Sequence, residues 1–233
     1  MRLFRDCLFR CMLGPSISRS LHSSIRKKDG FGIVAAMTRN QVIGVNGSLP
    51  WTNLAQDRNH FVNLTRNRVL LVGRRTFALE DASLAHIHHC RVCIVVSTSM
   101  KEDDLIAMRS NESERPMPKL LLTGSFDDAL KLARLENHRM THDDDERTIY
   151  DNRDDEMIDC WVAGGERIYK EALRHPYAKE VHLTHVDMFV DTSQCHDVAL
   201  FPLEEMYANN FEQISTRRDG KCKFNIYRGG RKI

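Results

Sequence analysis

The sequence predicts a single α/β domain with a mostly parallel central sheet, helices on both faces and antiparallel strands toward the C-terminus. Two observations support this prediction. Apolar runs of strand length alternate with helical segments, and several of these runs are apolar without interruption. Strands that alternate with helices favour parallel pairing, and an uninterrupted apolar strand is typical of a sheet that is buried on both faces.

The expected elements follow this alternation along the chain. Strands are predicted at 33–36, 69–72, 92–97, 119–122, 161–163, 181–187, 211–214 and 223–227. Helices are predicted over 54–65, from 76 toward 80, from Ser125 with two acids in its first turn, and from Gly165 through Ala172. The segment 42–47 is predicted to be a loop, because glycines and an asparagine punctuate it.

The domain is expected to span residues 30–233 and to contain one insertion. Nine of the seventeen residues from 143 to 159 are acidic, and we recognise no helical or strand period over about 136–159. A long segment of this kind inside a compact domain is usually an insertion. Residues 136–159 are therefore interpreted as an acidic, solvated loop.

Residues 1–29 are interpreted as a transit peptide that is not part of the fold. Residues 1–30 carry seven of the 34 basic residues but two of the 32 acidic ones, and residues 2–13 would form a basic amphipathic helix. This composition is typical of mitochondrial or plastid targeting. We expect the mitochondrial matrix, with the plastid, or the cytoplasm from a downstream start, as alternatives. The simpler alternative is a basic tail that carries no targeting signal.

Composition also argues against several function classes. Beyond residue 30 the net charge is −3, which is unsuited to non-specific nucleic-acid binding, and no apolar run reaches the ~18 residues of a membrane helix. Cys90 and Cys93 lie three apart at the start of a predicted strand, where they would point to opposite faces. No second ligand pair accompanies His86, His88 and His89, so no metal is expected. We expect a monomer with a small-molecule substrate and no nucleic-acid or membrane partner.

One acid in the first half of the domain is a candidate for proton transfer. Asp57 lies on the predicted helix 54–65 and shares a face with Leu54 and Phe61. A lone carboxyl group on the apolar side of a helix is costly to bury unless it has partners or a task. Burial would raise its pKa toward values that suit acid catalysis. The alternative is an acid at a helix start that faces solvent.

Three predicted strand ends carry features that bind anions. Residues 73–76 (GRRT) follow one strand and open a helix, residues 97–98 end a second strand, and Gly164-Gly165 ends a third before another helix. Each signal is weak alone, because a Gly-Gly pair often marks only a tight turn. Together they indicate a dinucleotide that lies across the carboxyl edge of the sheet, with phosphates at helix N-termini. Arg74 and Arg75 favour a 2′-phosphate, and therefore NADPH over NADH.

Taken together, these segments resemble the dihydrofolate reductase family from about Phe31 to the C-terminus. The matching segments are IVAAMTRNQVIGVNGSLPW, LAQDRNHFVNLT, VLLVGRRTF, RVCIVVS, GSFDDALKLA, WVAGGERIYKEAL, VHLTHV and KCKFNIYRGG. The combination of LPW with a downstream acid, GRxT and GG-x-x-IY is specific. The resemblance implies a dihydrofolate-reductase-like fold with NADPH as cofactor. It implies reduction of 7,8-dihydrofolate to 5,6,7,8-tetrahydrofolate, by hydride transfer to C6 and protonation of N5, in support of one-carbon metabolism.

The resemblance also implies roles for the matching residues. Asp57 is implied to be the catalytic acid, Thr184 the residue that bonds it, and Trp51 the aromatic that holds a nearby water. Arg91 is implied to grip the α-carboxylate of the substrate's glutamate. The loop from Asn40 to Trp51 is implied to be a lid. The other implied substrate-binding residues are Val34, Ala35, Leu54, Phe61, Ala163 and Tyr169. The implied cofactor-binding residues are Ala36, Ile43, Gly73, Arg74, Arg75, Thr76, Ser97, Thr98, Gly164, Gly165, Glu166, Arg167 and Ile168.

Four positions depart from the family pattern and bear on substrate affinity and antifolate sensitivity. Arg58 replaces a common Phe or Leu, His88 an apolar residue, Ala163 a larger Val or Ile, and Gly124 a basic residue. Two alternative functions remain open. A reductase of pyrimidine intermediates in riboflavin synthesis would share the fold but lack the Pro-Trp followed by an acid. A non-catalytic NADPH-binding scaffold would not need Asp57, Thr184 and Arg91.

Overall fold

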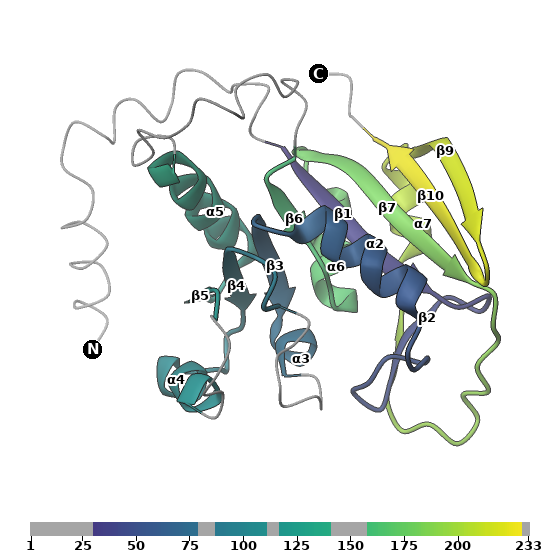
Figure 1. The fold of residues 1–233 in the computed structure, drawn as a ribbon, viewed down its shortest axis with the longest axis horizontal. Coiled ribbons are helices and arrows are strands. Elements are labelled where there is room, and N and C mark those ends of the chain that lie inside the picture. Colours follow the sequence, from purple (N-terminus) through teal and green to yellow (C-terminus); the bar gives the residue numbers. More distant parts are fainter. Residues whose placement is uncertain (1–29, 79–86, 111–116, 141–157, 230–233) are drawn as a thin grey trace.

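The computed structural model describes residues 30–78, 87–110, 117–140 and 158–229 of the chain. Eight strands form one twisted sheet in the order β5-β4-β3-β6-β1-β7-β10-β9 (Figure 1). Its strands are β1 (Phe31–Met37), β3 (Val69–Gly73), β4 (Val92–Val96), β5 (Lys119–Thr123), β6 (Cys160–Val162), β7 (Ala178–Val186), β9 (Glu212–Asp219) and β10 (Cys222–Arg228).

Strand pairing confirms the predicted mixture of directions. Every neighbouring pair from β5 to β7 is parallel, whereas β10 is antiparallel to both β7 and β9. A second, two-stranded sheet pairs β2 (Val42–Val45) with β8 (Val198–Leu200). The predicted loop over 42–47 was therefore wrong in its first four residues, because they pair with a segment far along the chain.

Helices cover both faces of the large sheet, as predicted. Leu71 and Ile94 point to the core that includes α5, α6 and α7, whereas Leu70 and Cys93 point to the core that includes α2, α3 and α4. Adjacent residues on a strand face opposite sides, so the uninterrupted apolar strands feed two cores. The helices are α2 (Ala55–Thr65), α3 (Arg74–Phe77), α4 (Glu102–Ser110), α5 (Phe126–Met140), α6 (Glu166–Arg174) and α7 (Leu203–Ala208).

Several boundaries differ from prediction. α3 begins at Arg74 instead of residue 76 and is a single turn. α5 continues to Met140, so the predicted start of the acidic insertion at residue 136 was wrong. Glu136 is 8% exposed and binds Lys119 Nζ at 2.9 Å, which places this last part of the helix in the packed domain. Residues 141–157 of the predicted insertion and the predicted transit peptide lie outside the described residues.

The Cys90–Cys93 pair also differs from prediction. Cys90 precedes β4, and both thiols are buried in the same core, where the contact with Cys90 and burial raise the pKa of Cys93 well above its usual value. Cys90 does not continue the strand, so the expectation of opposite faces was wrong. All five cysteines in the described part of the chain are free thiols. Within those same ranges no helix is long and apolar enough to span a membrane, and no metal-binding cluster is found.

Candidate active site

A large cavity lies at the carboxyl ends of the parallel strands. Its volume is about 1170 Å³, and its walls include the ends of β1, β3, β4 and β6. This edge is where open α/β sheets bind ligands. Ligand pockets usually enclose about 300–1,000 Å³, so this cavity is large for a ligand pocket.

The cavity brings together nearly all of the predicted site residues. Arg91 and Thr184 are the two that do not line it. The predicted substrate-binding residues on its wall are Val34, Ala35, Leu54, Asp57, Phe61, Ala163 and Tyr169. The predicted cofactor-binding residues on its wall are Ala36, Ile43, Gly73, Arg74, Arg75, Thr76, Ser97, Thr98, Gly164, Gly165, Glu166, Arg167 and Ile168.

Asp57 lies in the first turn of α2, which crosses in front of β1 and β7 (Figure 1). Its side chain is half-buried, and it lines the cavity together with Leu54 and Phe61. Burial raises the pKa of Asp57 from 3.8 to about 6, against opposing hydrogen bonds from Thr184 and Trp51. The alternative of a helix-start acid that faces open solvent was therefore wrong. A carboxyl group with this pKa can hold or release a proton near neutral pH.

Thr184 supports Asp57 from beneath the cavity wall. It lies on β7, opposite Ala36 of β1 and Phe224 of β10, and is 1% exposed. Its Oγ1 has no partner of good hydrogen-bond geometry within the described ranges, yet it is close enough to lower the pKa of Asp57. Trp51 provides the second contact, from the segment before α2.

Two groups in or beside the cavity were not predicted. Cys222 of β10 is fully buried, and burial, together with the charges of Asp57 and Asp219, raises its thiol pKa to about 11. It is therefore a neutral neighbour of Asp57 at physiological pH. The segment 197–199, at the start of β8, also lines the cavity. Neither has a signal in its local sequence, because each reaches the site through long-range strand pairing.

The Gly164-Gly165 turn brings the end of β6 against α6. Gly164 has φ +105°, and a Cβ there would lie 3.2 Å from the Tyr169 ring. Tyr169 is itself held by a 2.8 Å hydrogen bond from its hydroxyl to the Val34 carbonyl. The Gly73 amide donates to the Gly164 carbonyl at 2.7 Å. A side chain at Gly164 would therefore be strained and crowded, which explains the glycine.

The basic side chains that line the cavity differ in whether they pair with an acid of the described residues. Five basic and three acidic side chains line it. Three of the basic ones are engaged, in the pairs Arg75–Asp197 at 2.9 Å, Lys170–Glu166 at 2.7 Å and Arg167–Glu171 at 3.4 Å. Arg58 and Arg74 have no acidic partner among the residues that the structure describes.

The helix predicted to open at residues 73–76 is short. α3 is four residues long, and so short a helix has little dipole. α6 is nine residues long and begins directly after Gly165, so it keeps the predicted helix N-terminus.

Arg91 is held at a distance from the cavity wall. Its Nη1 donates to the Asn67 carbonyl at 3.2 Å, and its Nη2 donates to Asn137 Oδ1 at 2.7 Å. Its Nε is buried and has no partner among the described residues. Asn137 lies on the part of α5 that was predicted to be a loop, so its contact with Arg91 could not be anticipated.

The sheet, the cavity and the perturbed carboxyl group define an α/β enzyme that binds small molecules at the carboxyl edge of its strands. A family model described as dihydrofolate reductase matches residues 31–119. Dihydrofolate reductase of Rattus norvegicus is 25% identical over 205 residues, and that of Bos taurus is 28% identical; each alignment covers 83% of this chain and 94% of the relative. That of Drosophila melanogaster is 24% identical over 164 residues, covering 67% of this chain and 72% of the relative. The chain is therefore similar to dihydrofolate reductases over most of its length.

Proposed function

We propose that this chain reduces 7,8-dihydrofolate to 5,6,7,8-tetrahydrofolate with NADPH as the hydride donor, and so supplies one-carbon metabolism. The observation that carries this proposal is Asp57, a carboxyl group on the wall of a large cavity whose pKa is raised to about 6. The relatives are named for this activity.

The residues at the β3, β4 and β6 ends fit a dinucleotide phosphate. Gly73, Gly164 and Gly165 leave the backbone uncovered on the cavity wall, and Thr98 offers a hydroxyl. Arg74 has no competing acid among the described residues, so it is the cation best placed to bind a 2′-phosphate. When bound, NADPH supplies the hydride, and the protein supplies its position.

Asp57 is the group that handles the proton. Reduction adds a hydride at C6 and a proton at N5 of the pterin, so the site must supply one proton per turnover. The raised pKa keeps a useful fraction of the Asp57 carboxyl protonated near neutral pH. Thr184 and Trp51 lie close enough to lower its pKa and so favour the ionised form, while Leu54 and Phe61 provide an apolar wall for a flat ring.

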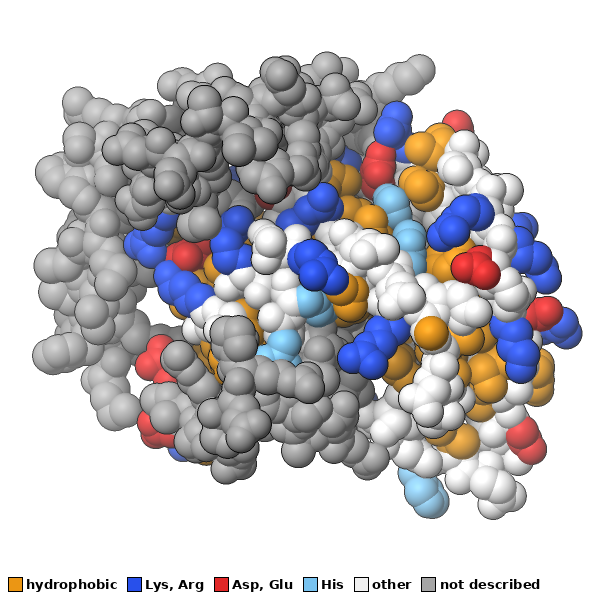
Figure 2. All heavy atoms as spheres, in the orientation of Figure 1, with side chains coloured by type: hydrophobic (Ala, Val, Ile, Leu, Met, Phe, Trp, Pro, Cys, Tyr) orange, Lys and Arg blue, Asp and Glu red, His pale blue; other side chains and the backbone are white. Residues whose placement is uncertain are grey.

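Two basic residues suit a substrate with a carboxylate tail. Arg91, whose Nε has no partner among the described residues, is the candidate for a bidentate pair with the glutamate α-carboxylate. Arg58, which has no acidic partner in the described ranges, adds a positive charge on the cavity wall. On the face that carries α2, basic side chains are prominent among the coloured residues (Figure 2). Such a surface attracts anionic ligands.

A substrate comparison with the full-length protein tests the proposal. NADPH absorbance should fall when dihydrofolate is added and should not fall with a pyrimidine intermediate of riboflavin synthesis. Turnover of the pyrimidine instead would assign the riboflavin-pathway reaction. NADPH binding without oxidation by either substrate would support a non-catalytic scaffold and overturn the proposal.

A further inference from the structure

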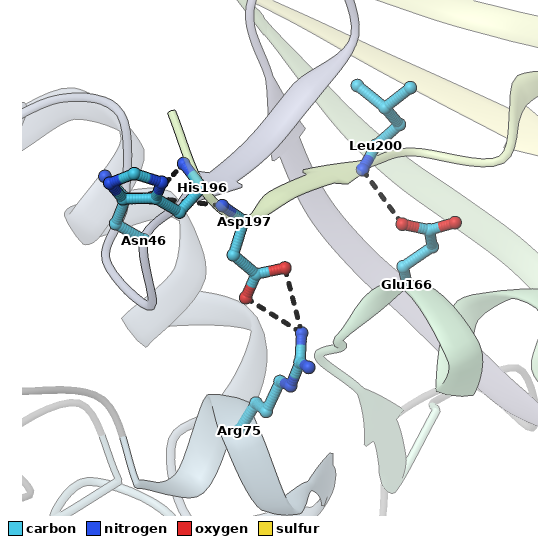
Figure 3. A network of polar contacts seen from close by, with 6 residues as sticks. All are labelled: Asn46, Arg75, Glu166, His196, Asp197 and Leu200. Atoms are coloured by element: carbon cyan, nitrogen blue, oxygen red, sulfur yellow. Dashed lines mark hydrogen bonds and ion pairs between the residues drawn. The ribbon is translucent and has the colours of Figure 1, made fainter. Parts of the chain in front are cut away.

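Arg75, a predicted cofactor-binding residue, is already occupied by an acid of the protein. Its Nη1 lies 3.1 Å from Asp197 Oδ1 and 2.9 Å from Oδ2, so both carboxylate oxygens share one donor (Figure 3). Both residues line the cavity. A carboxylate is a chemical stand-in for a phosphate oxygen pair at a guanidinium group. The structure thus shows an internal anion at an arginine that was expected to hold the cofactor.

Two side chains hold the backbone of the segment that carries Asp197. Asn46 Oδ1 accepts hydrogen bonds from the amides of His196 at 3.0 Å and Asp197 at 3.1 Å. At the other end of the segment, Glu166 Oε2 accepts from the Leu200 amide at 3.1 Å (Figure 3). Hydrogen bonds therefore hold the segment that carries Asp197, and the short Asp197 side chain limits how far its carboxylate can move. The pair with Arg75 is largely exposed, with side-chain exposures of 72% and 50%, so it is a weak bond.

The neighbour of Arg75 along α3, Thr76, lies beside the Gly164-Gly165 turn. Glu166 is the first residue of α6, directly after Gly165, and a Cβ on Gly165 would lie 3.3 Å from the hydroxyl of Thr76, the neighbour of Arg75. A glycine-rich strand end followed by a helix N-terminus is where the pyrophosphate of a dinucleotide binds. Arg75 is therefore close to the pyrophosphate position. Arg74, without an acidic partner in the described segments, remains for the 2′-phosphate.

We propose that Asp197 is a positioning residue that holds Arg75 until the pyrophosphate of the dinucleotide displaces it. The inference depends on the proposed function, because it takes a dinucleotide to be the ligand. It gives the two arginines different roles. Arg75 binds the pyrophosphate, which NADPH and NADH share, and Arg74 binds the 2′-phosphate, which only NADPH carries. Displacement also releases the segment 196–200 from α3 while its bonds to Asn46 and Glu166 remain.

Calorimetric titration of NADP⁺ and NAD⁺ into the full-length protein tests this inference. Asp197→Asn should tighten the binding of both dinucleotides by roughly two- to five-fold, the range expected for loss of one exposed ion pair. Arg75→Gln should weaken both, and adding Asp197→Asn to Arg75→Gln should change nothing further. The matched control is Asp187→Asn, which removes the same charge from the pair with Arg39, outside the cavity lining, and should leave both dissociation constants unchanged.

The outcomes separate this inference from the proposed function. If the wild type binds NADP⁺ and Asp197→Asn gives no gain, the inference is overturned and the proposed function stands. A gain for NADP⁺ alone would place the 2′-phosphate at Arg75 and contradict the assignment. If no variant binds either dinucleotide, both proposals fail.

Hydrogen exchange supplies a readout independent of binding. In Asp197→Asn the amides of His196 and Asp197 should keep the protection that Asn46 gives them. Loss of that protection together with weaker binding would mean that Asp197 is structural, and would overturn the inference.

Discussion

Replacing Asp57 by Asn is expected to stabilise the folded protein at neutral pH. The pKa of this carboxyl group is about 6 in the folded state against 3.8 in its ordinary environment. The folded state therefore binds more protons between about pH 4 and 6, so the free energy of unfolding falls as pH rises through that window. A shift of this size corresponds to at most about 3 kcal/mol. Because the side chain is only half-buried, we expect about 1–2 kcal/mol of stabilisation by the uncharged amide at pH 8.

Urea denaturation at pH 4, 6 and 8 measures this effect. The difference between Asp57→Asn and wild type should grow from near zero at pH 4 to its full value at pH 8. Asp128→Asn is a control of opposite sign, because hydrogen bonds from Lys131 and Ser125 lower the pKa of Asp128. That variant should lose stability above pH 4. An Asp57→Asn difference that is independent of pH would refute the claim that burial perturbs this acid.

Three further predictions concern the substrate tail, the cofactor and the N-terminus. Arg91→Leu should raise the KM for dihydrofolate roughly 10- to 150-fold and leave a pterin without glutamate unaffected; equal losses on both would make Arg91 structural. Arg74→Ala should narrow the NADPH/NADH ratio of kcat/KM more than Arg75→Ala does; an unchanged ratio in both would place the 2′-phosphate elsewhere, with Arg167 the next candidate. Residues 1–30 fused to a fluorescent protein should direct it to mitochondria and be cleaved. A diffuse cytosolic signal with an uncut N-terminus would contradict the targeting prediction, whereas a plastid signal would correct only the compartment.

The elements that sequence predicted well are those whose signal is local. The buried strands around Leu71 and Ile94 are uninterrupted apolar runs, and α5 begins with Ser125 and Asp128 exchanging hydrogen bonds as a capping pair. Asp57 could be identified because its apolar neighbours, Leu54 and Phe61, are one turn away on the same face. In these cases the residues that determine the structure lie within a few positions of one another.

The features that sequence missed depend on partners far along the chain. β2 and β8 are three or four residues long and are strands only because they pair with each other. Asp197 carries no motif, and its pairing with Arg75 follows from the anchoring of the segment around it. Asn137 was placed in a loop because the acidic run beyond it obscured the helical pattern. Long-range pairing of this kind cannot be read from local periodicity.

The central claim, that Asp57 supplies the proton for reduction of dihydrofolate, is tested most directly by single-turnover hydride transfer in Asp57→Asn and wild type across pH. The wild-type rate should fall with one ionisation as pH rises above about 6, the pKa of Asp57. Asp57→Asn should be slower by orders of magnitude, without that ionisation and with NADPH affinity nearly unchanged. A loss of less than about tenfold, which is about 1.4 kcal/mol of barrier, would contradict the claim.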